Sequence, residues 1–244
     1  MQSTVTLLAA GSLRRAFIPL CHRFTQLTGT HVDIHFGPAG LLRERIESGE
    51  PCAVFASANR QHPQTLLDAG RAREIALFAR NTLILTARNS VIHKDADWLT
   101  LLRDSSLRLA TSTPGCDPSG DYTWQMFDNI NALEAGLGDT LKQRAIQLVG
   151  GRDSLSVPAG EVASAWVIRE GLADLFIGYA HYATALNGCD DVRVVAIPAA
   201  QNIRCDYQLA LLKEDSAARA LYTFILSEEG QGYLRDAGFL SASE

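Results

Sequence analysis

Two short segments, each rich in small residues, carry the groups best suited to holding a ligand. Ala9–Leu13 follows the strand-like run Val5–Leu8, and Asp117–Tyr122 precedes a long amphipathic segment. Each segment is typical of a turn that leads into a helix, where the first N–H groups lack partners within the helix and point toward whatever lies ahead of them. Because neither segment contains Lys or Arg, the two indicate a site that holds an anion by hydrogen bonds alone.

Three further segments present similar groups. The turn Gly37–Gly40 offers the amides of Ala39 and Gly40, since Pro38 has no N–H to donate. Pro158–Glu161 repeats the small-residue pattern ahead of residues 162–170, and Tyr179 follows the apolar strand 175–177. Purely structural roles stay open: Ala39 and Gly40 could form a plain turn, and Tyr179 could be a buried core residue.

Ser12 and Ser119 supply hydroxyl groups at the two principal turns. Ser12 can cap a helix that begins at Leu13, or it can face a ligand at the carboxyl end of a strand, where ligands gather in α/β sheets. Ser119 stands at the start of a second helix, where Asp117 or Asp121 would complement the helix dipole.

Enzyme and metal-site motifs are missing from the sequence. It contains no phosphate-binding loop, dinucleotide fingerprint, nucleophile elbow or zinc-protease motif. We therefore expect a binding protein; an enzyme would have only Asp121, Glu161 and Tyr179 as base or nucleophile. His31 and His35 share one face of a strand without further ligands, so we expect surface histidines rather than a metal pair.

Composition narrows the class of protein further. The chain has 244 residues and a formal net charge of -5, which does not favour nucleic-acid binding, and no run is long enough to span a bilayer. No signal peptide precedes Val5, which leaves a mature extracytoplasmic form or a cytoplasmic protein. Of the five cysteines, Cys21 is expected in the core, and a disulfide between Cys189 and Cys205 is left open.

Strand and helix signals alternate along the chain. Strands are expected at residues 5–10, 32–36, 53–56, 82–87, 107–110, 173–177, 192–197 and 207–212. Helices are expected at residues 17–29, 41–49, 62–70, 121–135, 162–170, 216–226 and 228–237. This order predicts parallel sheets covered by helices on both faces.

The simplest arrangement has two Rossmann-like α/β lobes joined by two crossing strands. Residues 1–80 with 208–244 would form the first lobe and residues 81–207 the second. We expect the ligand in the cleft between the lobes, where such sites usually lie.

The chain resembles the periplasmic molybdate-binding proteins of ABC importers, which have the type II solute-binding fold. The resemblance rests on the opening segment 9–13, on 41–49 with 54–58, on 117–122, on 173–179, and on the closing segment 229–239. It implies an extracytoplasmic, monomeric receptor that captures a tetrahedral oxyanion, most simply molybdate or tungstate, and delivers it to a permease without any cofactor or direct metal ligand.

The same resemblance implies a set of ligand contacts. These are Ser12, Ala39, Gly40, Ser119, an amide of Glu161 or Val162, and the Tyr179 hydroxyl. Members of the family often have a serine in the second turn, where this chain has Pro38–Gly40. Molybdate only accepts hydrogen bonds, so an inward carboxylate from Asp117, Asp121 or Glu161 would indicate another ligand. A cytoplasmic sensor of the same fold, or a receptor for another small solute, remains the alternative.

Overall fold

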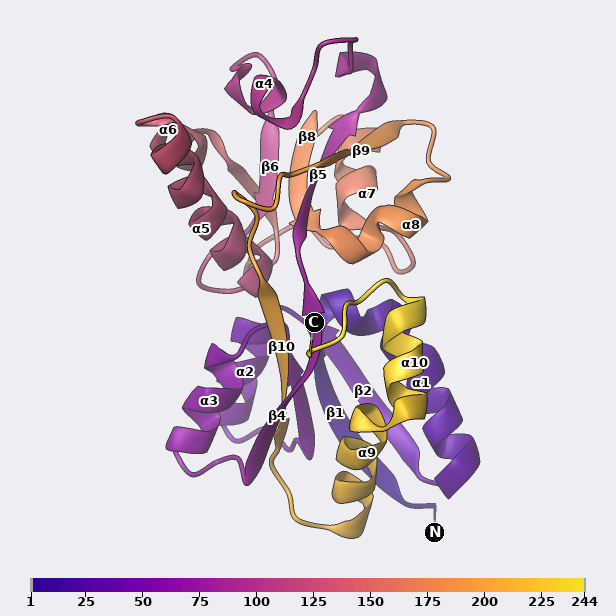
Figure 1. Cartoon of the computed structure of the whole chain (residues 1–244). Coiled ribbons are helices and arrows are strands. Elements are labelled where there is room, and N and C mark those ends of the chain that lie inside the picture. The colour runs from indigo at the N-terminus through magenta and orange to yellow at the C-terminus, as the bar shows by residue number, and fades with distance from the viewer. Residues whose placement is uncertain (1, 244) are drawn as a thin grey trace. The chain divides into compact units, whose positions relative to one another are not determined.

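The computed structural model describes residues 2–243 and divides the chain into two α/β units (Figure 1). Unit 1 consists of residues 1–81 and 205–244, and unit 2 of residues 82–204. The chain passes from β4 (Glu74–Asn81) into β5 (Leu83–Arg88) through Thr82 alone. The chain returns from unit 2 to unit 1 through residues 197–204, and the strand β10 begins at Cys205, close to the predicted start of the second crossing strand.

The second boundary differs from the predicted one by a few residues. The sequence placed it between residues 207 and 208, whereas the structure assigns Cys205 onward to unit 1. The reason is strand pairing: β10 (Cys205–Leu211) is antiparallel to β4, with Cys205 opposite Asn81.

Unit 1 is built on a five-stranded sheet of order β2-β1-β3-β10-β4. The remaining strands are β1 (Thr4–Ala10), β2 (His31–Gly37) and β3 (Val54–Ser57). Strands β2, β1 and β3 run parallel as predicted, but β10 is antiparallel to both of its neighbours. The prediction of an entirely parallel sheet was therefore wrong, and β4 was missed as a strand of its own.

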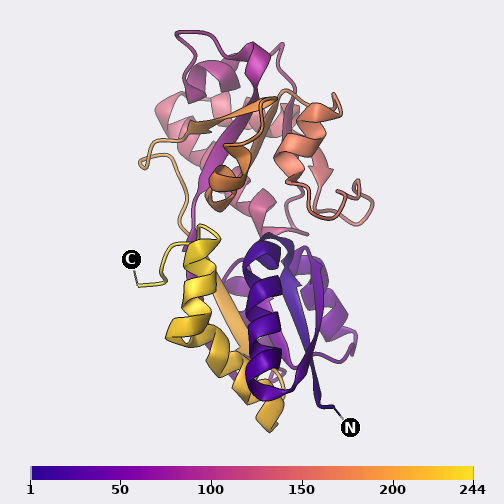
Figure 2. The same ribbon diagram turned by 90° about the vertical axis from the view of Figure 1, so that its right-hand side faces the viewer.

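Helices cover both faces of this sheet (Figures 1 and 2). One face carries α1 (Arg14–Thr28), α9 (Ser216–Leu226) and α10 (Glu228–Asp236), and the other carries α2 (Ala39–Glu47) and α3 (Gln61–Asp68). Helix α1 ends at Gly29, whose φ of 74° closes the last turn, as the sequence predicts. Cys21 on α1 is buried in the core, which confirms its predicted place.

Unit 2 repeats the same strand arrangement with order β7-β6-β8-β5-β9. Its other strands are β6 (Leu109–Ser112), β7 (Ile146–Val149), β8 (Leu175–Tyr179) and β9 (Val192–Ala196). Here β5 is the antiparallel strand, paired with β8 and β9. Strand β6 begins two residues later than predicted because a turn holds the preceding segment, with the Leu107 amide bonded to the Asp104 carbonyl.

The helices of unit 2 also lie on both faces of its sheet. They are α4 (Trp98–Arg103), α5 (Pro118–Leu133), α6 (Leu137–Arg144), α7 (Ala163–Arg169) and α8 (Ala183–Leu186). Figure 1 shows α5 and α6 on one side and α7 and α8 on the other. Helix α5 begins three residues before the predicted start because Asp117 caps it and Pro118 occupies its first position.

The cysteines form no disulfide within the described chain. All five are free thiols, including Cys189 and Cys205, whose pairing the sequence had left open. Cys205 is completely buried in β10, and burial raises the pKa of its thiol well above the usual value. It is therefore an inert core residue.

Candidate oxyanion-binding edges

In unit 1, the parallel register brings three loops to one edge of the sheet. Ala10 at the end of β1 lies opposite Gly37 at the end of β2, and Ala9 lies opposite Ala56 of β3. The segments that follow these strands contain Ser12, then Ala39 and Gly40, then residues 57–59. The carboxyl edge of unit 1 therefore gathers the predicted contacts of this half of the chain, together with one loop that the sequence analysis did not select.

Ser12 does not cap the first helix. It lies in the single turn Gly11–Leu13, while α1 begins at Arg14 with Leu13 in the cap position and no side-chain cap. Instead, the Ser12 hydroxyl lies 2.8 Å from the hydroxyl of Tyr207 on β10, and both side chains are buried. The predicted capping role was wrong because the turn places Ser12 two residues ahead of the helix.

Ala39 and Gly40 are the first two residues of α2, with Pro38 in the cap position and no side-chain cap. The first intrahelical bond of this end is donated by the Leu42 amide to the Pro38 carbonyl. The amides of the first turn therefore point out of the helix at the carboxyl edge, where they can donate to an anion. Both residues are buried.

The loop after β3 carries a polar network. The Ser57 hydroxyl donates to Asn59 Oδ1 at 3.0 Å, and the amide of His62 donates to the same oxygen at 3.0 Å. His62 is buried, and its two ring nitrogens have no hydrogen-bond partner among the described residues. Burial, with the nearby charge of Arg43, lowers the pKa of His62 to about 4, so this ring is neutral at pH 7.

In unit 2, the helix start that follows a parallel strand at the carboxyl edge is that of α5, which comes after β6. Asp117 is the N-cap: its carboxylate accepts the Ser119 amide at 3.3 Å and the Ser112 hydroxyl at 2.5 Å. Burial raises the pKa of Asp117 to about 6, although both hydrogen bonds oppose this shift. Ser119 is the second residue of the helix and is buried.

Asp121 and Glu161 are also engaged within unit 2. Asp121 lies in the first turn of α5, and its Oδ1 accepts the Gly115 amide at 2.8 Å. Glu161 forms an ion pair with Arg169 at 3.2 Å. Glu161 lies outside helix α7, which begins at Ala163 after the cap residue Val162.

The amides of Glu161 and Val162 differ in whether they already donate a hydrogen bond within unit 2. The Glu161 amide already donates to the Pro158 carbonyl at 3.1 Å. Val162 caps α7 and is buried, and its carbonyl accepts the first intrahelical bond, from Trp166. Val162 is therefore the better placed donor of the two.

Tyr179 is the last residue of β8 and is buried. Its ring centroid lies 6.4 Å from that of Tyr122 on α5 and 6.1 Å from that of His181. Parallel pairing of β8 with β6 brings Tyr179 to the same edge as the turn before Ser119. Ser119 and Tyr179 thus share the carboxyl edge of unit 2.

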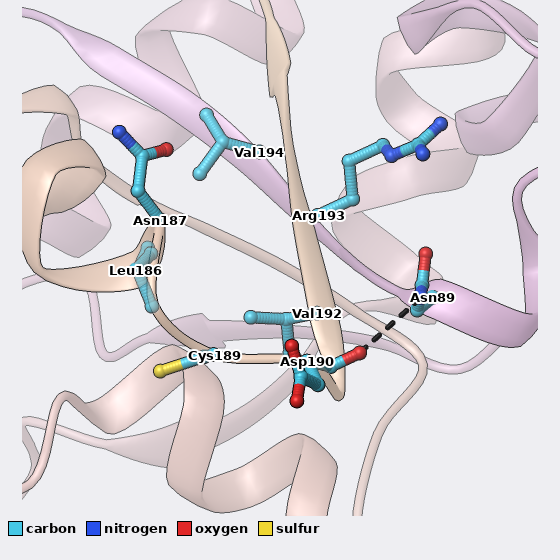
Figure 3. Close-up of a pocket in the computed structure, with 8 residues that line it drawn as sticks. All are labelled: Asn89, Leu186, Asn187, Cys189, Asp190, Val192, Arg193 and Val194. Atoms are coloured by element: carbon cyan, nitrogen blue, oxygen red, sulfur yellow. Dashed lines mark hydrogen bonds between the residues drawn. The ribbon is translucent and has the colours of Figure 1, made fainter.

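An open depression of about 550 Å³ lies elsewhere on unit 2 (Figure 3). It is lined by Asn89, Leu186, Asn187, Cys189, Asp190, Val192, Arg193 and Val194. Val192 pairs with Arg88 at the end of β5, and Ala87 pairs with Leu175 at the beginning of β8. The depression therefore lies at the amino end of β8, opposite the edge that carries Tyr179.

Residues 2–243 contain no group of three or more His, Cys, Asp or Glu side chains arranged to hold a metal ion. His31 and His35 are both exposed on β2, and His35 lies 3.1 Å from Asp33, so their predicted surface position is confirmed. In the same described range, none of the helices is both long and apolar enough to cross a membrane.

Two sheets of this order, each with helix starts and hydroxyl groups at its carboxyl edge, define a two-lobed solute-binding protein. The chain matches the family of bacterial extracellular solute-binding proteins over residues 5–240, and it belongs to that family.

Two relatives illustrate the range of similarity. A protein of Pasteurella multocida, described as uncharacterized, is 44% identical over 97% of this chain and 98% of its own length. The molybdate-binding protein ModA of Escherichia coli is 26% identical over 98% of this chain and 89% of its own length.

Solved structures show the same fold. The periplasmic molybdate-binding protein of Azotobacter vinelandii has a TM-score of 0.75 and 19% identity, covering 97% of this chain and 98% of that chain. The sulfate-binding protein SubI of Mycobacterium tuberculosis has a TM-score of 0.76 and 18% identity, covering 97% of this chain and 86% of that chain. The fold alone therefore does not distinguish molybdate from sulfate.

Proposed function

We propose that this protein is the extracytoplasmic receptor of an ABC importer, works in the periplasm as a monomer and captures a tetrahedral oxyanion, molybdate or tungstate. The family supplies the receptor class and its transport role. The choice of an oxyanion rests on the donors at the two carboxyl edges: the Ser12 and Ser119 hydroxyls, the first amides of α2, the Val162 amide and the Tyr179 hydroxyl.

The observation that carries this proposal is the engagement of all three nearby carboxylates within unit 2. Asp117 accepts bonds from Ser112 and Ser119, Asp121 accepts one from Gly115, and Glu161 pairs with Arg169. A carboxylate facing a dianion would repel it, and a low-dielectric site would magnify that repulsion. Carboxylates held by their own donors are what a receptor for a fully ionised anion requires.

The same observation argues against an enzyme. A general base or nucleophile must reach the reacting atoms of its substrate. Asp121 and Glu161 are committed to a loop amide and to Arg169, and Tyr179 is buried at a strand end. The proposed ligand is bound and released without chemistry, and no cofactor is required.

A thermal-shift panel tests the choice of ligand. We expect molybdate and tungstate to stabilise the protein well above sulfate and phosphate, since a ligand at about 100 times its Kd adds roughly 2.7 kcal/mol. Sodium chloride at matched ionic strength is the control. Stabilisation by sulfate alone would keep the oxyanion class and change the ion, whereas no shift with any of the four would refute the oxyanion proposal.

A further inference from the structure

The segments that leave the parallel strands of unit 1 are rich in arginine. The six residues after each of the strands β1, β2 and β3 include no Asp or Glu but four arginines: Arg14, Arg15, Arg43 and Arg60. Helices α1, α2 and α3 begin there, and none of them has an acidic residue in its first turn. Because a helix start itself carries partial positive charge, this edge is electropositive in a chain whose formal net charge is -5.

Arg14 is held at the carboxyl edge by an aromatic ring. It is the first residue of α1, and it is exposed. Its guanidinium carbon lies 4.5 Å from the centroid of the Phe36 ring, and Phe36 lies opposite Ala9 near the ends of β2 and β1. A cation in the first turn opposes the helix dipole, so this position is unfavourable for the helix itself.

Arg60 is similarly unfavourable at the start of α3. It is the cap residue of that helix, a position that favours Ser, Thr, Asp or Asn. Its side chain is 65% exposed and lies 4.0 Å from the Asp206 carboxylate, a distance at which an exposed pair is weak. Asp206 also lies opposite Arg80 in the strand pairing, so arginine outweighs this one carboxylate. Arg43, by contrast, is paired with Glu47 on its own helix at 3.0 Å.

The principal turn of unit 2 has the opposite charge. The six residues after β6 contain Asp117 and no Lys or Arg, and Asp121 lies in the first turn of the helix α5 that follows. An anion in solution is therefore attracted to the carboxyl edge of unit 1 and repelled by the carboxylates of this turn.

We propose that Arg14 and Arg60 steer the oxyanion to the carboxyl edge of unit 1, where the hydroxyl and amide donors then hold it. This inference rests on the proposed function, because it concerns the same site. Neither arginine contacts the bound ion: their field raises the rate of association and leaves the rate of dissociation unchanged. Since a doubly charged anion feels twice the attraction of a singly charged one, the steering favours dianions.

The kinetics of molybdate binding test the steering. Stopped-flow mixing, followed by the fluorescence of the three tryptophans, gives both rates for wild type, Arg14→Gln, Arg60→Gln and Arg14→Lys, after melting curves have confirmed that each is folded. At about 0.01 M salt, where the Debye length is about 30 Å, each glutamine variant should associate about threefold more slowly, with unchanged dissociation. Arg14→Lys keeps the charge and should associate at the wild-type rate.

Salt provides a second measurement on the same proteins. At about 1 M salt the Debye length is about 3 Å, so the association rates of all variants should converge. Calorimetric Kd values for molybdate should follow the rates, with the glutamine variants about threefold weaker than wild type at low salt and equal to it at high salt. A loss of affinity that persists at high salt would show that the arginines contact the bound ion, and would overturn the steering.

Arg71→Gln is the matched control. Arg71 is exposed like Arg60, but it follows the end of α3 at Asp68, whereas Arg60 precedes its start. The control removes the same charge at the opposite end of the same helix, so association should slow clearly less than in the two edge variants. Equal slowing in all three glutamine variants would mean that net charge sets the rate, and would overturn the role of the carboxyl edge.

Two further outcomes separate the inference from the proposed function. If wild type binds molybdate but Arg14→Gln and Arg60→Gln keep its association rate and Kd at low salt, the steering is wrong and the receptor assignment stands. If wild type binds no molybdate in the calorimeter, the proposed ligand fails, and the steering of that ligand fails with it.

Discussion

Ser12 is the residue at which ligand binding and fold stability can be separated most cleanly. Ser12→Ala removes a hydroxyl donor to the anion, and a hydrogen bond to a charged group contributes roughly 1.5–3 kcal/mol, so the affinity should fall more than about tenfold. Calorimetry measures this loss. The unfolding free energy of the ligand-free protein should fall by about 1–3 kcal/mol, because the variant removes the bond between Ser12 and the buried Tyr207 hydroxyl.

Ser48→Ala is a suitable control for this variant. Ser48 is an exposed serine of the same unit, and its hydroxyl donates to the carbonyl of Glu44, four residues earlier in the chain. Its removal should leave the affinity unchanged. An unaltered affinity for Ser12→Ala would instead leave Ser12 as a structural partner of Tyr207.

Glu161 is a residue of unit 2 whose substitution, unlike that of Ser12, should leave the molybdate affinity almost unchanged. Its ion pair with Arg169 is exposed, and exposed pairs contribute little to stability. Glu161→Gln should therefore bind molybdate within a few-fold of wild type, and the affinity should vary little between about pH 7 and 8, where ordinary carboxylates and Asp117, with its pKa of about 6, are ionised. Loss of binding in this variant would show that the carboxylate contacts the ligand, and would point to a ligand other than a fully ionised oxyanion.

At the same scale, the sequence predicts some site residues well and others not at all. Ser12 and Ser119 were selected because small-residue turns after apolar strands are visible locally. Tyr207 was not, because its role depends on a register that joins β10 to β4 and β3. Ser57 and Asn59 were overlooked because their loop has no glycine-rich signature, although it follows a parallel strand that ends at the same edge.

Among the elements, helix α5 shows how a cap can depend on pH. Burial raises the pKa of its cap residue Asp117 to about 6 in the folded protein, above the ordinary value of 3.8. Between these values the folded state holds the Asp117 proton more tightly than the unfolded state, so Asp117 lowers stability as pH rises from about 4 to 6, whereas His62, whose folded pKa is lowered to about 4, raises stability over the same range. Asp117→Asn, which keeps a good cap residue, should remove the Asp117 contribution and make stability increase more steeply with pH between about 4 and 6.

Chemical denaturation at a series of pH values measures this effect. Asp104→Asn is the control, since Asp104 is exposed and its pKa is lowered by the hydrogen bonds from Ser106. The Asp104 variant should retain the wild-type slope between pH 4 and 6. If Asp117→Asn also retains that slope, the raised pKa of Asp117 does not contribute to it.

The loop after β7 packs against the start of helix α5. Gly150 has a φ of 77°, and a Cβ there would collide with the Ser112 hydroxyl and the Asp117 carboxylate. Gly160, later in the same loop, has a φ of 84° but open space around its Cβ position. Gly160→Ala should cost about 1–3 kcal/mol for the left-handed backbone alone, and Gly150→Ala should cost clearly more. Equal unfolding free energies would contradict the close packing of this loop.

Element boundaries were predictable where local chemistry decides them. Helix α9 was predicted with its observed bounds, and Gly29 ends α1 as expected. The start of α5 was missed by three residues because Pro118 and Ser119 were assigned to the turn, whereas Asp117 draws them into the helix. The first turn of α2 was missed in the same way: Ala39 and Gly40 were assigned to a turn but are helical.

Over the whole molecule, the two units have the same strand arrangement, although no internal repeat in the sequence indicates it. Each sheet places its antiparallel strand fourth, β10 in one and β5 in the other. These strands are buried almost throughout, and an apolar-rich segment indicates that a strand is internal but not which way it runs. The sequence could therefore predict the fold class and not the mixed direction of the strands.

Proteins described as molybdate-binding and as sulfate-binding match the fold of this chain almost equally well, so the ligand must be identified by binding. Calorimetric titration of the purified protein with molybdate tests the molybdate assignment most directly, with sulfate as the competing ion. The donor-only arrangement predicts saturable binding of one molybdate per chain, with an affinity well above that for sulfate. Absence of binding heat for molybdate, together with an unchanged melting temperature, would contradict it.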